Sequence, residues 1–244
     1  MELNRPLATV TPTLDGDVLA ALARHDAVFT TGQLRRLLAG RSEEGIRKVL
    51  RRLTRQGIVH AERIGNAYAY RLNREHLAAQ HIIGLAQLQE TFLRRLADRL
   101  AAWPVSPVYA AVFGSAARGT MTLASDLDLL LIRPEDADSD QWEAQVGDLV
   151  AEVTRWIGND TRPLEFTAAE VTAHGRDQAV LHAALSEGLT VAGTRAWLSR
   201  QLRKGRGGRA DATVRRGDPP RPPAQGGTVQ GTGGPDPRPG RPGH

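Results

Sequence analysis

The stretch that most constrains this chain is VFGSAARGTMTLASDLDLLLI, at residues 112–132. An apolar segment leads into Gly114 and Ser115, and Asp126 and Asp128 stand one residue apart at the head of a second apolar segment. Because side chains alternate between the two faces of a strand, we expect both carboxylates to point the same way. Two neighbouring like charges need a counter-charge, and carboxylate oxygens are ligands that Mg²⁺ prefers. The pair therefore predicts a divalent-cation site.

Small residues at Gly114 and Ser115 follow the first of these predicted strands. They let backbone amides approach a ligand closely, and such amides suit a phosphate group. Arg118 comes shortly afterwards, and two roles are open for it: contact with a phosphate, or structural pairing with an acidic side chain. A phosphate cradle beside two aspartates predicts that a metal bridges the carboxylates and a nucleoside triphosphate.

The pattern GSAARG followed by SDLDLL resembles the nucleotidyltransferase superfamily that includes DNA polymerase β, and is closest to its minimal bacterial members. The resemblance covers about residues 104–195. It implies transfer of a nucleoside monophosphate, AMP from ATP, to an acceptor hydroxyl, with Mg²⁺ or Mn²⁺ as cofactor. It also implies that Asp126 and Asp128 hold two metals while Gly114 and Ser115 contact the triphosphate.

Active members of that superfamily usually carry a third carboxylate on a later strand. Here residues 140–157 predict an amphipathic helix, and residues 163–167 predict a short strand after it. Leu164 and Phe166 share one face of that strand, which leaves Glu165 on the other. We therefore expect Glu165 to be the third catalytic carboxylate and metal ligand.

Residues 14–75 predict three helices followed by a β-hairpin that turns at Gly65 and Asn66. This order resembles the winged helix-turn-helix family of bacterial regulators, whose third helix enters the major groove of DNA while the hairpin contacts the backbone. The predicted helices cover residues 14–24, 30–38 and 42–55.

The third predicted helix carries its apolar residues on one face and basic residues mostly on the other. We expect these basic residues and one in the hairpin to bind DNA, and the competing role is a protein-interaction module. The expected DNA-binding residues are Arg47, Lys48, Arg51, Arg52 and Arg63.

The rest of the chain divides into a connecting helix, at residues 76–103, and a tail rich in Gly, Pro and Arg, at residues 199–244. We expect this helix to pack in the core or to form a homodimer interface. The tail predicts disorder, either as a basic arm for nucleic acid or as an unselected extension. The predicted class is α/β (α+β), with a winged helix at residues 1–75 and a small mixed-sheet nucleotidyltransferase domain at residues 104–198.

Composition excludes several protein classes. The chain has 244 residues and no cysteine, which excludes disulfides and thiolate zinc sites. No signal pattern or apolar stretch long enough to cross a membrane is present, so we expect a cytoplasmic protein without membrane contact. The net charge of +5 combines basic ends with an acidic middle, and does not by itself indicate nucleic-acid binding.

Three functions follow from these patterns. The first is a DNA-binding nucleotidyltransferase whose acceptor is a small molecule or a tyrosine on a partner toxin of the HEPN ribonuclease type, in an antitoxin role. The second is a transcriptional regulator whose nucleotidyltransferase domain senses nucleotide or is inactive. The third is an interaction scaffold that binds neither nucleotide nor DNA. The fused winged helix favours a regulatory or toxin–antitoxin role over drug modification.

Overall fold

The computed structural model of this chain describes residues 1–204, which form ten α-helices, two short 3₁₀ helices and seven strands in two sheets. This confirms the predicted α/β class. Within these residues no helix has both the length and the apolar character needed to cross a membrane. The predicted disorder of the tail falls outside the described residues, except for positions 199–204.

The N-terminal elements match the predicted three helices and hairpin to within a residue or two. Thr30 and Ser42 cap the second and third helices by accepting hydrogen bonds from backbone N–H groups. The three strands form an antiparallel sheet in the order β1-β3-β2, and Gly65 makes the hairpin turn with φ +60°. The elements are η1 (Pro6–Thr9), α1 (Leu14–Arg24), β1 (Phe29–Thr30), α2 (Thr31–Leu37), α3 (Glu43–Arg55), β2 (Val59–Ile64) and β3 (Ala67–Leu72).

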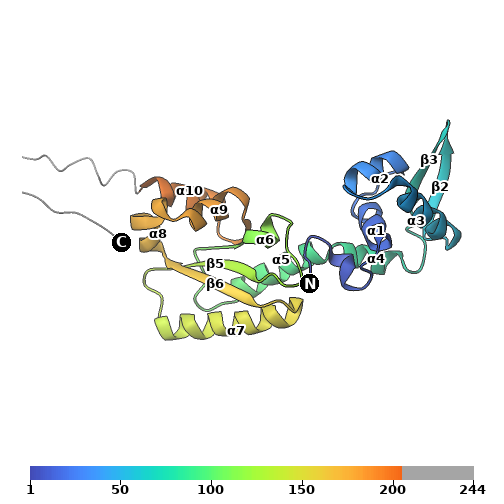
Figure 1. Cartoon of the computed structure of the whole chain (residues 1–244). Coiled ribbons are helices and arrows are strands. Elements are labelled where there is room, and N and C mark those ends of the chain that lie inside the picture. Colours follow the sequence, from blue (N-terminus) through green and yellow to red (C-terminus); the bar gives the residue numbers. More distant parts are fainter. Residues whose placement is uncertain (205–244) are drawn as a thin grey trace, which may run out of the picture. The chain divides into compact units, whose positions relative to one another are not determined.

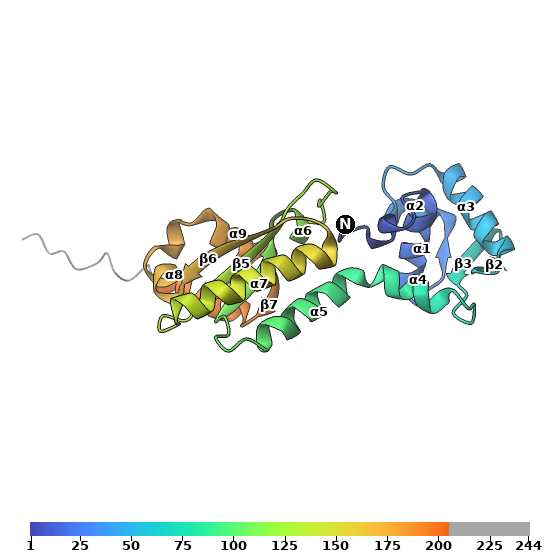
Figure 2. The ribbon, with the colours of Figure 1, turned by 90° about the horizontal axis from the view of Figure 1, so that it is seen from below.

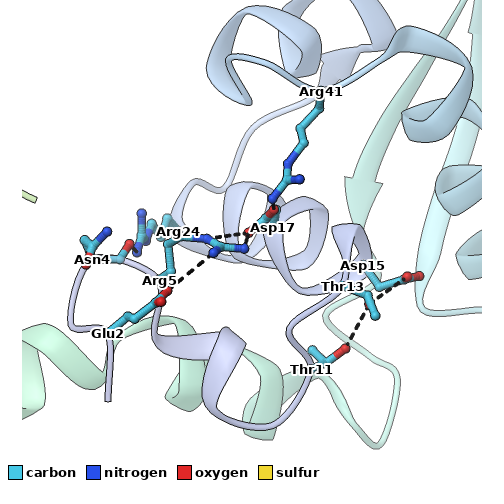
Figure 3. A network of polar contacts seen from close by, with 9 residues as sticks. All are labelled: Glu2, Asn4, Arg5, Thr11, Thr13, Asp15, Asp17, Arg24 and Arg41. Atoms are coloured by element: carbon cyan, nitrogen blue, oxygen red, sulfur yellow. Dashed lines mark hydrogen bonds and ion pairs between the residues drawn. The ribbon is translucent and has the colours of Figure 1, made fainter. Parts of the chain in front are cut away.

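An ion-pair network holds the start of α1 (Figure 3). Asp17 accepts from Arg5 at 2.9 Å and from Arg41 at 2.8 Å, one on each carboxylate oxygen. Arg5 also reaches Glu2 at 3.3 Å. Asp17 is in the first turn of α1, where a negative charge is favourable to the helix dipole. The network ties the segment before α1 and the loop before α3 to that helix.

The connecting segment differs from its prediction. Instead of one helix it forms α4 (Ala79–Ala86) and α5 (Leu88–Ala101), which meet at Gln87. Gln87 has φ −96° and ψ 10°, outside the α-helical region, so the helix is interrupted there. The apolar spacing continues across the break, which is why periodicity alone does not predict it.

The C-terminal elements build a four-stranded mixed sheet in the order β6-β5-β4-β7. β5 and β6 are parallel, and the other neighbours are antiparallel. The last helix continues to Lys204, so residues 199–204 are helical and not part of a tail as predicted. The elements are β4 (Tyr109–Phe113), α6 (Gly114–Ala117), β5 (Leu127–Arg133), α7 (Ser139–Ile157), β6 (Thr161–Thr167), α8 (Ala168–His174), η2 (Gly175–Asp177), α9 (Ala179–Glu187), β7 (Leu189–Ala192) and α10 (Arg195–Lys204).

Helices cover both faces of this sheet. Figure 1 shows α7 on one side of the strands, with α8, α9 and α10 on the other, and Figure 2 looks at the face covered by α7 and α5. Leu129 and Leu131 of β5 pack into the core with α5 and α7, whereas Leu130 and Ile132 pack into the core with α8, α9 and α10. Since alternate residues of β5 enter different cores, the two faces can be told apart residue by residue.

Candidate functional site

The turn from β4 into α6 is built around Gly114. Its φ is +67°, a conformation that favours glycine, and a Cβ at this position would lie 2.2 Å from Oδ2 of Asp128. Ser115 follows in the short α6 and accepts a hydrogen bond from Thr120 N–H through its backbone carbonyl, at 2.9 Å. Only glycine therefore lets the backbone pass this close to the Asp128 carboxylate.

The two aspartates lie where β5 begins. Asp126 directly precedes the strand, and Asp128 is its second residue and pairs with Phe113, the last residue of β4. The pairing brings Asp128 next to the Gly114 turn. Burial raises the pKa of Asp128, and the charge of Asp126 raises it further, while the positive charges of Arg162 and Arg118 partly offset both effects.

Arg162 of β6 stands opposite this pair. It is the register partner of Asp128 in the parallel pairing of β5 with β6, and its Nη2 lies 2.8 Å from Oδ2 of Asp126. Its side chain is 72% exposed, while that of Asp126 is 28% exposed. The sequence analysis does not single out Arg162, because an arginine in a short strand carries no signal until the strand pairing is known.

The structure corrects the prediction for Glu165. Its register partner is Leu131, whose side chain belongs to the core with α5 and α7. Trp142 of α7 donates its indole N–H to Glu165 at 2.5 Å. Glu165 therefore lies on the face opposite Asp128 and does not join the aspartates. Among residues 1–204, no group of three or more His, Asp or Glu side chains could hold a metal.

Arg118 follows α6 and pairs with Glu187 at the end of α9, with 2.7 Å between Nη1 and Oε1. Its side chain is half exposed, and its charge also acts on Asp128. Of the two roles considered from the sequence, the structure shows the pairing with an acidic side chain, and contact with a phosphate stays a prediction.

Asn159, which the sequence analysis missed, holds the loop that leads into Asp126. It is 3% exposed, and its Nδ2 donates toward the backbone carbonyls of Thr122, Leu123 and Ser125 at 3.4, 3.2 and 2.9 Å. An amide buried among three carbonyls fixes the backbone that carries them. A residue directly after a helix C-cap glycine gives no sequence signal for such a role.

A groove lies in the N-terminal part, between α3, the start of α2 and the hairpin. It has a volume of about 820 Å³, and its lining includes Arg47, Arg51, Arg55, Tyr68 and Tyr70. The three arginines recur every fourth residue, so they form one stripe along α3. This surface brings together two predicted DNA-binding residues with Arg55 and two tyrosines that the prediction did not include.

The other predicted DNA-binding residues lie outside the lining of this groove. Lys48 is exposed on α3, and Arg52 forms an ion pair with Asp15 of α1. Arg63 is in the hairpin and donates to the Gly65 carbonyl at 3.2 Å. On α3, the three arginines Arg47, Arg51 and Arg55 thus line the groove, whereas Arg52 turns toward α1.

Comparisons with known proteins gave one family match and several structural neighbours. Residues 93–161 match the family model of the nucleotidyltransferase domain, and no match was found among curated proteins. Among solved structures, one described as a toxin-antitoxin with AMP-PNP is 16% identical with a TM-score of 0.35, and covers 46% of this chain and 82% of its own. One described as the toxin-antitoxin MntA-HepT is 14% identical with a TM-score of 0.32, covering 48% and 83%.

The family match begins within α5 and ends at the first residue of β6. It contains the Gly114 turn, both aspartates and Asn159. The predicted enzyme class, a nucleotidyltransferase, is confirmed at the level of this domain. The part of the chain that matches the nucleotidyltransferase domain model, residues 93–161, thus holds both aspartates.

Proposed function

We propose that this chain is a DNA-binding, metal-dependent nucleotidyltransferase that moves a nucleoside monophosphate, AMP from ATP, to an acceptor hydroxyl. One observation carries the proposal: Asp128, two residues after Asp126, lies against a Gly114 turn that has no room for a Cβ. Backbone amides of this turn would approach a phosphate, and the aspartates would supply the negative charge that a cation needs.

A divalent cation fits the donor set at this site. Asp126 and Asp128 would hold Mg²⁺ or Mn²⁺, which supplies Lewis-acid chemistry and neutralises the triphosphate. Burial raises the pKa of Asp128 and the charge of Asp126 raises it further, and the positive charge of a bound cation would lower it. The resemblance implied two metals held by three carboxylates, but Glu165 is on the other face, so the aspartates alone form the donor set.

The chain's own groups would act by binding and orienting the nucleotide. The backbone at Gly114 and Ser115 would bind phosphate oxygens, and Arg118 lies where its charge can support them. The acceptor oxygen would bond to the α-phosphorus, the bond to the bridging oxygen would break, and pyrophosphate would leave. The acceptor's hydroxyl proton would pass to water. Asn159 would keep Asp126 in position throughout by holding the preceding loop.

DNA binding belongs to the same proposal. The stripe of Arg47, Arg51 and Arg55 on α3 faces the hairpin across a groove, as expected for a winged helix on a duplex. The tyrosines beside the stripe offer apolar and hydrogen-bonding contacts. A tyrosine of a partner toxin remains our proposed acceptor, on the strength of the GSAARG and SDLDLL resemblance.

A second candidate function has one specific observation in its favour. No acidic residue of β6 shares the face of Asp126 and Asp128, and Arg162 occupies the position in register with Asp128. A site with two carboxylates and an arginine could bind nucleotide without transferring it. In that case the chain would be a regulator whose DNA affinity depends on nucleotide.

Labelling separates the two functions. We would incubate the protein with α-labelled ATP, GTP, CTP or UTP and Mg²⁺ or Mn²⁺, using cell lysate from the source organism as the acceptor pool. A labelled product with wild type, but not with Asp126→Ala/Asp128→Ala, supports the transferase. The matched control, Asp136→Ala/Asp148→Ala, removes two exposed carboxylates and should keep the activity. Nucleotide binding with no labelled product would favour the regulator.

A further inference from the structure

Arg162 occupies the one position of β6 that lies directly opposite Asp128. The parallel register pairs the two residues, and the Arg162 guanidinium reaches Asp126 at 2.8 Å. One arginine thus faces both aspartates of the site, and its charge lowers the pKa of Asp128 against the effects of burial and Asp126. It is a counter-charge that the chain itself provides.

No other residue of β6 supplies a counter-charge on the face that carries Asp128. Leu164 and Phe166 have the same strand parity as Arg162, and both pack with the core formed by α8, α9 and α10. Glu165 has the opposite parity and hydrogen-bonds with Trp142. The site therefore receives two negative charges from β5 and its preceding residue, and one positive charge from β6.

The ion pair between Arg162 and Asp126 is easily exchanged. The Arg162 side chain is 72% exposed. Exposed pairs of this kind contribute little to stability, because water screens them. A guanidinium is permanently charged and its planar fork matches phosphate oxygens, so a nucleotide can take the place of Asp126 as its partner.

We propose that Arg162 takes the place of a second divalent cation: the site holds one cation per nucleotide, and the guanidinium binds a phosphate group of the nucleoside triphosphate. This rests on the proposed function, because it assumes that Asp126 and Asp128 hold a metal–nucleotide complex. In the free protein Arg162 pairs with Asp126, and in the complex it turns to the phosphates while the cation takes both carboxylates.

Binding of a non-hydrolysable analogue tests this without depending on activity. Manganese bound per site would be counted by electron paramagnetic resonance in the presence of α,β-methylene ATP, and nucleotide affinity measured by calorimetry. Wild type should bind one Mn²⁺ per nucleotide. Arg162→Ala should bind the nucleotide about tenfold more weakly, the loss of a charge-assisted contact, and Arg162→Lys should recover part of this. Arg200→Ala, which removes an exposed arginine from α10, should match wild type.

The charge-reversed variant Arg162→Glu should change the affinity for Mn²⁺ as well as the affinity for nucleotide. It places a third carboxylate opposite Asp128, so it should bind Mn²⁺ without nucleotide at least about tenfold more tightly than wild type. It should also bind the nucleotide more weakly than Arg162→Ala does. A purely structural role for Arg162 would leave the nucleotide affinity of Arg162→Ala unchanged, and thermal unfolding would show that each variant is folded.

Two results would overturn the inference and are distinguishable. If wild type binds nucleotide with two Mn²⁺ ions and Arg162→Ala binds it equally well, the assignment of Arg162 is wrong while the nucleotide site stands. If wild type binds no nucleotide with either metal, the proposed function fails and the inference fails with it.

Discussion

Gly114 is the residue at which the site depends most closely on backbone conformation. Its positive φ costs other residues about 1–2 kcal/mol, and an added Cβ would meet the Asp128 carboxylate at 2.2 Å. We predict that Gly114→Ala lowers the free energy of unfolding by at least about 1 kcal/mol, or roughly 2–4 °C in melting temperature. It should also weaken nucleotide binding, because the backbone and Asp128 must move apart.

Gly147 provides the matched control for this substitution. It lies inside α7, and a Cβ added there would have no other atom within 4 Å, so alanine at this position should stabilise the helix by about 1 kcal/mol. Thermal and urea unfolding of both variants would measure the two effects. If Gly114→Ala proved as stable as wild type and bound nucleotide equally well, this would contradict the claim that the site depends on the close approach of the Gly114 backbone to Asp128.

Asp128 makes the stability of the domain depend on pH. Because its pKa is raised in the folded protein, ionisation of Asp128 disfavours folding, so its stabilising contribution is present at acid pH and is lost as pH rises through the folded pKa. Asp128→Asn cannot ionise. In EDTA we therefore predict that this variant is more stable than wild type at neutral pH. The difference in stability should disappear at pH values below the ordinary pKa of an aspartate.

Unfolding curves of wild type and Asp128→Asn between pH 3 and pH 8, with pH as the only variable, would measure the difference in their free energies of unfolding. This range spans the ordinary aspartate pKa of about 3.9. Added Mg²⁺ should then stabilise wild type more than Asp128→Asn, because the cation replaces the missing counter-charge. A variant that is less stable than wild type at neutral pH in EDTA would contradict the account of the carboxylate pair.

At the scale of elements, α3 is the helix whose surface we expect to contact DNA. Replacing Arg47 and Arg51 with alanine should weaken binding to duplex DNA and reduce the slope of log affinity against log salt concentration by about two, since each phosphate contact contributes about one. Titrations at several salt concentrations measure this slope. The control is Arg94→Ala/Arg155→Ala, which removes the same charge from exposed positions on α5 and α7. Equal slopes for both variants would indicate a protein-interaction surface instead.

The elements that sequence patterns predicted best are those with local signals. The α3 helix has an apolar stripe and a capping serine, and the hairpin has a two-residue turn, so their bounds agree closely with the structure. The prediction of one connecting helix was wrong, because the break at Gln87 leaves the apolar spacing unchanged.

The face of Glu165 could not be predicted from local pattern. Alternation shows that Glu165 and Leu164 point to opposite faces, but not which face carries the aspartates. The prediction places the apolar face away from the metal, and this fails because helices cover both faces of the sheet. Only the register of β5 with β6 places Arg162, and not Glu165, opposite Asp128. That pairing joins segments separated by all of α7, so no local rule contains it.

At the scale of the whole molecule, the account assigns two activities to two parts of one chain. The helix-and-hairpin part carries the arginine groove, and the mixed-sheet part carries the aspartate pair. Basic residues prevail in the first part and acidic residues in the second. We therefore expect polyanionic DNA to bind the first part without occupying the nucleotide site.

The most direct test of the central claim compares two labels in ATP. Transfer of a nucleoside monophosphate carries the α-phosphate to the acceptor and releases the γ-phosphate in pyrophosphate. With acceptor present, the account predicts that α-labelled ATP labels a product, that γ-labelled ATP does not, and that Asp126→Ala/Asp128→Ala abolishes the signal. Labelling from the γ-position, or α-labelling that survives in the double variant, would contradict nucleotidyl transfer at these two aspartates.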